Sequence, residues 1–207
     1  MADYKTIRGT ATFEYEEKRS RFIATASFAD TEENALAVLN AVRTANRTAR
    51  HNVYAYVLQN GRTRYSDDGE PAKTAGTPVL ETIGHAGVAD VIVVVTRYFG
   101  GILLGTGGLV RAYTQAVKEG LAHCETGILR KGCELEVAAE YNDVGKLQYY
   151  FGQQGIVPTD SIYAENVKFI LLIPVEKEEK VRKNLTETTC GKVKIEKLKE
   201  TYFVDKE

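Results

Sequence analysis

The stretch DVIVVVTRYFGGILLGTGGLVRAY, from Asp90 to Tyr113, decides the fold of the first two-thirds of the chain. Its first part, DVIVVVT, is apolar on both faces, which predicts a central strand covered on each side. The strand runs directly into a loop with five glycines, the first of which is Gly100. A helix follows, and we expect it to bury one face made of Val110, Tyr113, Val117 and Leu121.

The residues before this stretch alternate between strand and helix patterns. ATFEYEE (11–17) and RFIATASFA (21–29) mix aromatic and β-branched residues with polar ones, which is typical of half-buried strands. A helix follows them, with Asp30 as its expected N-cap, Glu33 three residues on, and an apolar stripe of Leu36, Leu39, Val42 and Ala45. NVYAYVLQ (52–59) and TRYSDD (63–68) predict a hairpin around the two-residue turn Asn60-Gly61. Thr77 and Pro78 then supply the cap and first-turn proline of another helix.

After Cys124 the pattern restarts in a different order. CELEVAAE (133–140) and VKFILLI (167–173) are strands, SIYA (161–164) pairs with the second of them, and KVKIEKLKETYFV (192–204) is the last strand. Helices are predicted over DVGKLQYYFGQQ (143–154), closed by Gly155, and over EKEEKVRKNLTE (176–187). The order βαββαβ is that of a ferredoxin-like α+β sandwich. We therefore place a domain boundary near Thr126-Gly127, giving domains 1–126 and 127–207.

Composition excludes several classes of protein. Lys and Arg total 27 against 28 for Asp and Glu, so no overall positive field attracts nucleic acid or anionic membrane, and any such partner needs a local patch. Cys124, Cys133 and Cys190 give neither a disulfide framework nor a Cys-x-x-Cys site. The segment MADYKTIRGT lacks the apolar core of a signal peptide, and the apolar runs are too short to span a bilayer. We expect a soluble cytoplasmic protein without a membrane partner.

The glycine loop matches neither common nucleotide motif. The dinucleotide fingerprint fails because Val110 stands at its last glycine position, and the P-loop fails because Thr106 stands at its lysine position. A helix that begins at Gly107 or Gly108 would still point free N–H groups at an anion, with Arg97 and Arg111 as phosphate partners. The alternative is that the glycines only allow positive φ at a sharp turn.

A second candidate loop is SDDGEPAKTAGTP, from Ser66 to Pro78. Its carboxylates Asp67, Asp68 and Glu70 have three functional readings: magnesium ligands, an acid and base pair, or orienters of Arg97 or Arg111 beside a ligand site. The alternative is a solvated polar turn.

Other candidate sites have less support. Arg43, Arg47 and Arg50 share one helix face beside His51, which suits phosphates, but they also lie where the helix dipole favours cations. The histidines are too dispersed for zinc, no Gly-x-Ser-x-Gly elbow is present, and we expect neither a metal nor a cofactor.

Three stretches together carry a family resemblance. They are ARHNVYAYV (49–57), YSDDGEPAKTAGTPVLE (65–81) and VVVTRYFGGILLGTGGLVRAY (93–113). Their combination strongly resembles the IMPACT family in its bacterial YigZ-like form, over essentially the whole chain. The resemblance implies an N-terminal domain similar to domain four of elongation factor G and a C-terminal ferredoxin-like domain similar to domain five. It also implies a non-catalytic, translation-linked regulator whose eukaryotic relatives bind an activator of an initiation-factor kinase and whose bacterial forms bind RNA or the ribosome.

The resemblance also implies which residues form a shared binding site between the two signature loops. By position, they are Asp67, Asp68, Glu70, Thr74, Gly76, Arg97, Tyr98, Phe99, Gly100, Gly101, Gly105, Gly107, Gly108 and Arg111. We add Lys73 of the first loop to this expected site. One departure is that Lys73 occupies a position where the family pattern has glycine. If that backbone needs positive φ, the lysine is strained, and otherwise it adds a cation to the site.

Three functions remain open from the sequence. The first is a regulator that binds RNA or the ribosome through an anion site at the two loops. The second is an enzyme that acts on a phosphorylated small molecule, with Asp67, Asp68 or Glu70 as metal ligand or base. The third is a protein-interaction module without an anion site.

Overall fold

Two units of antiparallel sheet and covering helices make up residues 3–205, the part of the chain that the computed structural model describes. The N-terminal unit contains Tyr4–Leu129 and the chain from Val204 on, and the C-terminal unit contains Arg130–Phe203. The predicted α+β class is confirmed. The units divide inside one strand, β7 (Thr126–Ala139), which also contains the predicted domain boundary between residues 126 and 127. That boundary stays a prediction.

The sheet of the N-terminal unit has β6 at its centre, as DVIVVVT predicts. Every residue from Val91 to Arg97 is buried, because strands flank β6 on both sides and helices cover both faces. All neighbouring strands are antiparallel. The strand order is β2 (Thr10–Glu17), β3 (Ser20–Phe28), β6 (Val91–Tyr98), β4 (His51–Val57) and β5 (Thr63–Ser66).

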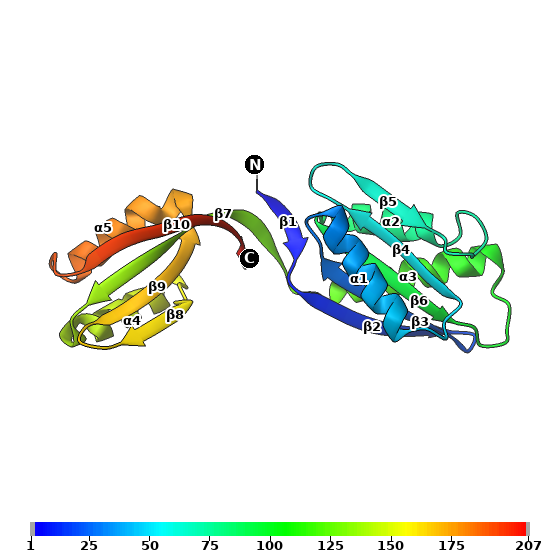
Figure 1. The fold of residues 1–207 in the computed structure, drawn as a ribbon, viewed down its shortest axis with the longest axis horizontal. Coiled ribbons are helices and arrows are strands. Elements are labelled where there is room, and N and C mark those ends of the chain that lie inside the picture. Colours follow the sequence, from blue (N-terminus) through cyan, green and yellow to red (C-terminus); the bar gives the residue numbers. More distant parts are fainter. Residues whose placement is uncertain (1–2, 206–207) are drawn as a thin grey trace. The chain divides into compact units, whose positions relative to one another are not determined.

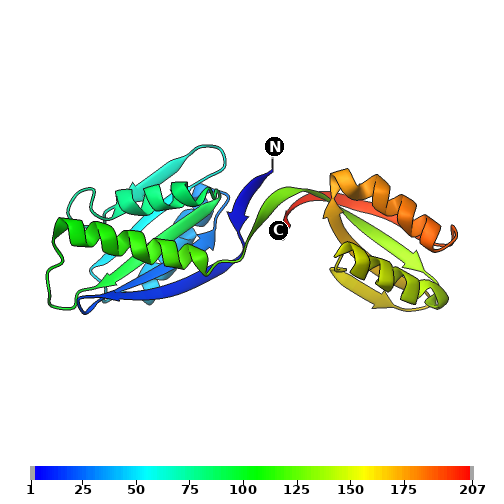
Figure 2. The ribbon, with the colours of Figure 1, turned by 180° about the vertical axis from the view of Figure 1, so that it is seen from behind.

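Three helices cover this sheet from opposite sides. Figure 1 shows α1 (Glu32–Ala45) in front of it, and Figure 2 shows α2 (Gly76–Ala86) and α3 (Gly105–Ala122) on the other face. Leu39 of α1 packs in one cluster with Tyr54, Tyr56 and Val94. On the other face, the larger cluster contains Val53, Val93, Val79, Ile83, Tyr113 and Val117.

The predicted caps of α1 and α2 are wrong. The Thr31 hydroxyl accepts the Asn34 N–H of α1 at 3.1 Å, whereas the Asp30 carboxylate accepts the Asn34 side-chain amide instead. Thr31 is the N-cap because it immediately precedes the helix, where its side chain reaches the first free N–H groups. Helix α2 begins at Gly76, before Thr77, so Thr77 lies inside its first turn.

Three further expectations differ from the structure. The β4–β5 connection is longer than a two-residue turn, because Leu58 N–H donates to the Arg62 carbonyl and Gly61 has φ of 84°. That is a three-residue loop closed by a left-handed glycine. Val110 is 37% exposed and lies outside the core, whereas Tyr113, Val117 and Leu121 are buried. Helix α3 begins at Gly105, earlier than Gly107 or Gly108.

The short first strand, at residues 4–7, was not predicted from the sequence. Strand β1 (Tyr4–Ile7) pairs with Thr126–Leu129 of β7. The buried Asp90 carboxylate holds this region together, because it accepts hydrogen bonds from the Tyr4 hydroxyl and from the Gln59 N–H.

The C-terminal unit has the predicted order βαββαβ. After β7 come α4 (Tyr141–Gln154), β8 (Asp160–Tyr163), β9 (Val167–Pro174), a 3-10 turn (Val175–Lys177), α5 (Glu178–Thr188) and β10 (Lys194–Asp205). The strand order in the sheet is β10, β7, β9, β8. Leu135, Phe169 and Leu171 of the sheet pack against Leu147 and Phe151 of α4. As predicted, Gly155 closes α4 in the left-handed conformation.

Candidate functional site

Four connections of the N-terminal unit meet at one end of its sheet. Because neighbouring strands are antiparallel, Tyr98 at the end of β6 pairs with Arg21 near the start of β3, and Arg97 pairs with His51 at the start of β4. The β2–β3 turn, the α1–β4 segment, the β5–α2 loop and the β6–α3 loop therefore lie together, on the right in Figure 1. We call this region the loop end, and it includes both signature loops.

The Asp67 carboxylate caps helix α2 from the preceding loop. One oxygen accepts the N–H groups of Ala75 and Gly76 at 3.1 and 2.8 Å, and the other accepts the Lys73 N–H at 3.0 Å. Gly76 is required here, because a Cβ would lie 2.8 Å from the Ser66 backbone. The negative charge stabilises the positive end of α2, and the N–H groups of Ala75 and Gly76 are already bonded and so are not available to a phosphate.

Lys73 lies in the loop closed by Asp67 and has φ of 63°. The position therefore does need the left-handed conformation, and lysine is strained where the family pattern has glycine. Its side chain is exposed and forms no ion pair within residues 3–205. The neighbouring Thr74 is buried, and its hydroxyl donates to the Pro71 carbonyl at 2.6 Å. Thr74 thus stabilises the loop.

Asp68 ties the same loop to α1 and β4. Its carboxylate accepts Arg43 Nη2 at 2.9 Å and the Asn52 N–H at 2.7 Å. Its carbonyl oxygen lies 2.8 Å from His51 Nδ1, which acts as the donor. Arg43 is consequently paired within the protein, whereas Arg47 and Arg50 further along are exposed without an ion pair in the described chain.

Glu70 joins the two signature loops through a buried ion pair. Its Oε1 accepts Arg97 Nη1 at 2.7 Å and the Tyr113 hydroxyl at 2.8 Å. The side chains of Arg97 and Glu70 are only 7% and 3% exposed. Burial, and then the nearby Glu70 carboxylate, raise the pKa of Tyr113, so the hydroxyl stays protonated and donates. The prediction that Arg97 contacts an anion at the surface is therefore wrong, since its charge is used inside the protein.

These contacts weaken the enzyme hypothesis. Asp67 caps a helix, Asp68 pairs with Arg43 and Glu70 pairs with Arg97, so each of the three carboxylates already has internal partners. A general base or a metal ligand needs a carboxylate that faces the substrate or ion. Among residues 3–205, no group of three or more His, Cys, Asp or Glu side chains is placed to hold a metal.

The glycines of the second loop have different causes. At Gly100, a Cβ would lie 2.0 Å from the Arg19 backbone, so glycine allows the loop to touch the β2–β3 turn. Gly101 and Gly105 have φ of 87° and 72°, which favours glycine. Gly107 has open space apart from Arg111 Nη1, and Gly108 approaches only the Leu104 side chain. Backbone geometry therefore explains three of the five glycines. Gly107 and Gly108 are not explained in this way, and with Gly105 they leave most of the first turn of α3 without side chains.

The two aromatic residues before these glycines have different surroundings: Tyr98 is bonded within the protein, whereas Phe99 is half exposed. The Tyr98 hydroxyl donates to Asn46 Oδ1, and Arg21 lies over the Tyr98 ring. Phe99 is 50% exposed, with the buried Arg97 guanidinium 5.7 Å from its ring centre. Beyond it, Leu103 is 83% exposed at the tip of the loop.

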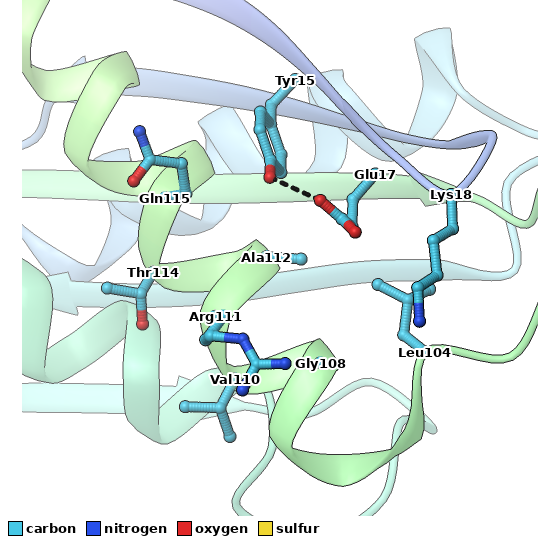
Figure 3. Close-up of a pocket in the computed structure, with 10 residues that line it drawn as sticks. All are labelled: Tyr15, Glu17, Lys18, Leu104, Gly108, Val110, Arg111, Ala112, Thr114 and Gln115. Atoms are coloured by element: carbon cyan, nitrogen blue, oxygen red, sulfur yellow. Dashed lines mark hydrogen bonds between the residues drawn. The ribbon is translucent and has the colours of Figure 1, made fainter.

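Helix α3 begins without a side-chain cap and without an acidic residue in its first turn. Arg111 folds back toward this turn, since its Nη1 lies 3.6 Å from the position of a Gly107 Cβ. Beside it is a pocket of about 530 Å³, and Figure 3 shows Lys18 and Arg111 on opposite sides of it. The second signature loop thus leads into an open, positively polarised helix start. The sequence predicts such a start after both loops, but the start of α2 is capped by Asp67.

Exposed cations gather at the loop end although the chain as a whole has a net charge of −1. The six exposed members that form no ion pair within residues 3–205 are Lys18, Arg19, Arg47, Arg50, Lys73 and Arg111. Sequence reasoning missed Lys18 and Arg19. The polar pair between the strands 11–17 and 21–29 was the available signal, because a two-residue hairpin turn there returns to the end of the sheet where the next strand must finish.

Comparisons with known proteins assign the unit that carries these features to the Impact N-terminal domains. The family model described as Impact N-terminal domain matches residues 18–121, and a domain of unknown function (DUF1949) matches residues 137–192. The chain belongs to the IMPACT family.

Several relatives support this assignment. The chain is 34% identical to the IMPACT family member YvyE of Bacillus subtilis, covering 98% of this chain and 94% of that protein. It is 34% identical to the IMPACT family member YigZ of Escherichia coli, covering 86% and 89%. It is also similar to a solved structure titled "Crystal structure of an hypothetical protein", with TM-score 0.62, 32% identity and coverage of 96% and 98%. Across residues 3–205, no helix combines the length and apolarity needed to cross a membrane.

Proposed function

We propose that this protein is a translation-linked regulator that binds RNA, free or in the ribosome, through the loop end of its N-terminal unit. The observation that supports it most directly is the group of six exposed cations that form no ion pair within residues 3–205. Five of them lie on three adjoining connections, and the sixth, Arg111, lies in the second turn of α3. Lysine and arginine contacts to phosphates release counterions from the nucleic acid and supply most of the non-specific affinity. The three carboxylates of the first signature loop, Asp67, Asp68 and Glu70, are paired internally and do not cancel this charge outward.

The anion contacts of the proposal differ in part from those expected from the sequence. Arg111, Lys73 and the bare first turn of α3 with Gly105, Gly107 and Gly108 remain, and Lys18, Arg19, Arg47 and Arg50 are added. Arg97, Asp67, Asp68, Glu70, Thr74 and Gly76 hold the two loops in place. We also propose, from the family resemblance, that the two units correspond to domains four and five of elongation factor G. The strand order of the C-terminal sheet supports the second correspondence.

The test is the salt dependence of binding. Labelled single-stranded RNA and ribosomes are titrated at several salt concentrations with the wild type and with Lys18→Ala/Arg19→Ala/Arg111→Ala. We expect wild-type affinity to fall steeply with salt, and the slope of log K against log salt to decrease by about 2 in the triple variant, since each lost contact to single strands removes about 0.7.

A matched control removes three exposed cations elsewhere. Arg62, Lys118 and Lys180 form no ion pair within residues 3–205, and none lies on the loop end. Their triple alanine variant has the same net charge as the first and is expected to keep the wild-type slope. Equal slopes in the two triple variants, or binding that ignores salt, would reject the proposal.

The exposed loop tip favours a second candidate, a protein contact. Phe99, Ile102 and Leu103 are 42% to 83% exposed within one short loop. Apolar side chains at the centre of a surface patch are typical of protein interfaces. Leu103→Asp separates the two candidates, because it is expected to weaken binding to a protein surface, including that of the ribosome, while binding of naked RNA keeps its salt slope.

A further inference from the structure

The pocket at the loop end contains a carboxylate that phosphate binding alone does not explain. It lies between the end of β2 and the first turns of α3, with Tyr15, Glu17 and Lys18 on one side and Leu104, Arg111 and Gln115 among the residues on the other (Figure 3). Its volume of about 530 Å³ is within the usual range for small-molecule sites. A carboxylate repels a phosphate in direct contact, so Glu17 calls for a ligand with a hydrogen-bond donor as well.

Glu17 is held so that one of its oxygens remains available. The Tyr15 hydroxyl donates to Glu17 Oε2 at 2.9 Å, and Oε1 has no hydrogen-bond partner within residues 3–205. This hydrogen bond is the main cause that raises the pKa of Tyr15, so the tyrosine remains the donor near neutral pH. Neither Lys18 nor Arg111 forms an ion pair with Glu17. The pocket therefore offers one free acceptor and two free cations.

The remaining lining suits a flat, partly apolar group. Leu104 and Val110 supply apolar walls, and Val110 is the α3 residue that the helical pattern would have placed in the core. The Gln115 side-chain amide nitrogen donates a hydrogen bond to Glu119 Oε1 at 2.8 Å, and its carbonyl oxygen remains available as an acceptor. The Thr114 hydroxyl, also in the lining, forms no hydrogen bond within the described chain. Apolar walls with a few polar groups are typical of base-binding pockets.

We propose that this pocket binds one ribonucleotide of an RNA chain, with Lys18 and Arg111 contacting phosphate and Glu17 Oε1 accepting the ribose 2′-hydroxyl. The proposal rests on the proposed function and makes it specific. Phosphate contacts are the same for RNA and DNA, whereas the 2′-hydroxyl is the group that tells them apart. A bound strand shields Glu17 Oε1 from water. RNA replaces that water with its 2′-hydroxyl donor, whereas DNA has no 2′-hydroxyl and leaves the oxygen without a hydrogen bond, which costs free energy.

The experiment compares RNA and DNA of one sequence. Single-stranded oligonucleotides are titrated against the full chain by fluorescence anisotropy, and the ratio of the two dissociation constants is the readout. For the wild type we expect RNA to bind about tenfold more tightly, the value of one hydrogen bond to a charged group. Glu17→Ala should bring the ratio close to one. Removing a negative charge raises the affinity for both strands, but that effect cancels in the ratio.

Three controls isolate Glu17. Glu16→Ala, at the neighbouring exposed position of β2, removes the same charge outside the pocket and should keep the ratio. Tyr15→Phe removes the hydroxyl that occupies Oε2 and should also keep it. Lys18→Ala should weaken the binding of both RNA and DNA and reduce the slope of log K against log salt. It should leave the ratio of the two dissociation constants unchanged.

The outcomes separate this inference from the proposed function. Salt-dependent binding with equal affinity for RNA and DNA in the wild type overturns the 2′-hydroxyl contact and leaves the proposed function standing. A wild-type preference for RNA that survives Glu17→Ala also overturns the role of Glu17. If neither oligonucleotide nor ribosomes bind at any salt concentration, the proposed function fails first, and the pocket inference fails with it.

Discussion

The Arg97 guanidinium is buried, lies 5.5 and 5.7 Å from the ring centres of Phe22 and Phe99, and pairs with Glu70 at 2.7 Å. Its Nε has no hydrogen-bond partner among the described residues, so the pair is incompletely satisfied. Breaking a buried pair by removing one member leaves the other charge uncompensated.

We therefore expect Arg97→Met to lower the free energy of unfolding by about 3 to 5 kcal/mol. Urea unfolding followed by circular dichroism measures this. The variant should keep the wild-type salt slope for RNA, because Arg97 is not exposed to a ligand. Arg97→Met/Glu70→Met should lose less than the sum of the single changes, since no lone charge remains. A stable Arg97→Met protein with a reduced salt slope would restore Arg97 as a phosphate contact.

Residue types alone could not separate these roles. Arg97 and Arg111 look equivalent in the sequence, but the alternation of β6 turns Arg97 inward toward Glu70, whereas Arg111 lies on the exposed side of α3. One of the hypotheses from the sequence was that a carboxylate of the first loop holds Arg97 in place. The ion pair between Glu70 and Arg97 fits that hypothesis. Burial depends on tertiary neighbours, so it could not be assigned without the fold.

At the scale of elements, helix α2 depends on a cap outside its own first turn. Asp67 accepts three N–H groups around the start of α2, and the N-cap residue Ala75 has no side-chain acceptor of its own. We expect Asp67→Ala to cost about 2 kcal/mol, the upper range for loss of a helix cap. Hydrogen exchange at Ala75 and Gly76 should speed up with it.

Two companion variants sharpen the Asp67 measurement. Asp67→Asn keeps an acceptor but not the charge, so it should lose clearly less stability than Asp67→Ala. Asp160→Ala removes an exposed carboxylate whose only hydrogen-bond partner within residues 3–205 is the next N–H, and its effect should stay within about 0.5 kcal/mol. If all three variants have the stability of the wild type, Asp67 does not support α2.

Elements with long regular patterns were predicted well from the sequence, and those defined by distant partners were not. The apolar run of β6 and the glycine stop of α4 are local signals, and both are confirmed. The cap of α2 and strand β1 depend on residues far along the chain, namely Asp67 and Thr126–Leu129. A local rule therefore placed the cap at Thr77 and gave no strand at Tyr4–Ile7.

At the scale of the whole molecule, charge is distributed unevenly although the totals nearly cancel. The loop end is cationic, while the C-terminal unit forms internal networks such as Lys197 with Glu178 and Glu200, each at 2.9 Å. Hydrogen bonds from Lys131 and Lys197 lower the pKa of Glu200 to about 2, and the bond from Lys197 lowers the pKa of Glu178. Counting charges along the sequence could not reveal this distribution.

This network predicts a pH dependence of stability. A carboxylate with a lowered pKa in the folded state stabilises the protein above its unfolded value of about 4.5 and loses that contribution as pH falls through the folded value. We expect the Tm of wild type to fall between about pH 4.5 and 2. Lys197→Met should lower Tm at pH 7 and converge with wild type near pH 2.

Calorimetry over this pH range measures the effect, with Lys180→Met as the control. Lys180 is exposed on the same helix as Glu178 and forms no ion pair in the described chain, so its Tm should match wild type throughout. A constant difference between Lys197→Met and wild type down to pH 2 would show that Lys197 acts by packing and not by charge.

The pairing of β1 with β7 has a consequence for how the chain is made. Tyr4–Ile7 is synthesised well before its partner residues Thr126–Leu129, which follow strand β6 and helix α3 in the chain. The five-stranded sheet from β2 to β6 can form before β1 has a strand to pair with, so the β1–β7 pairing, a long-range contact, is late and slow to form. A chain truncated before residue 126 would therefore contain all five strands of the β2–β6 sheet and a first strand without its pairing partner.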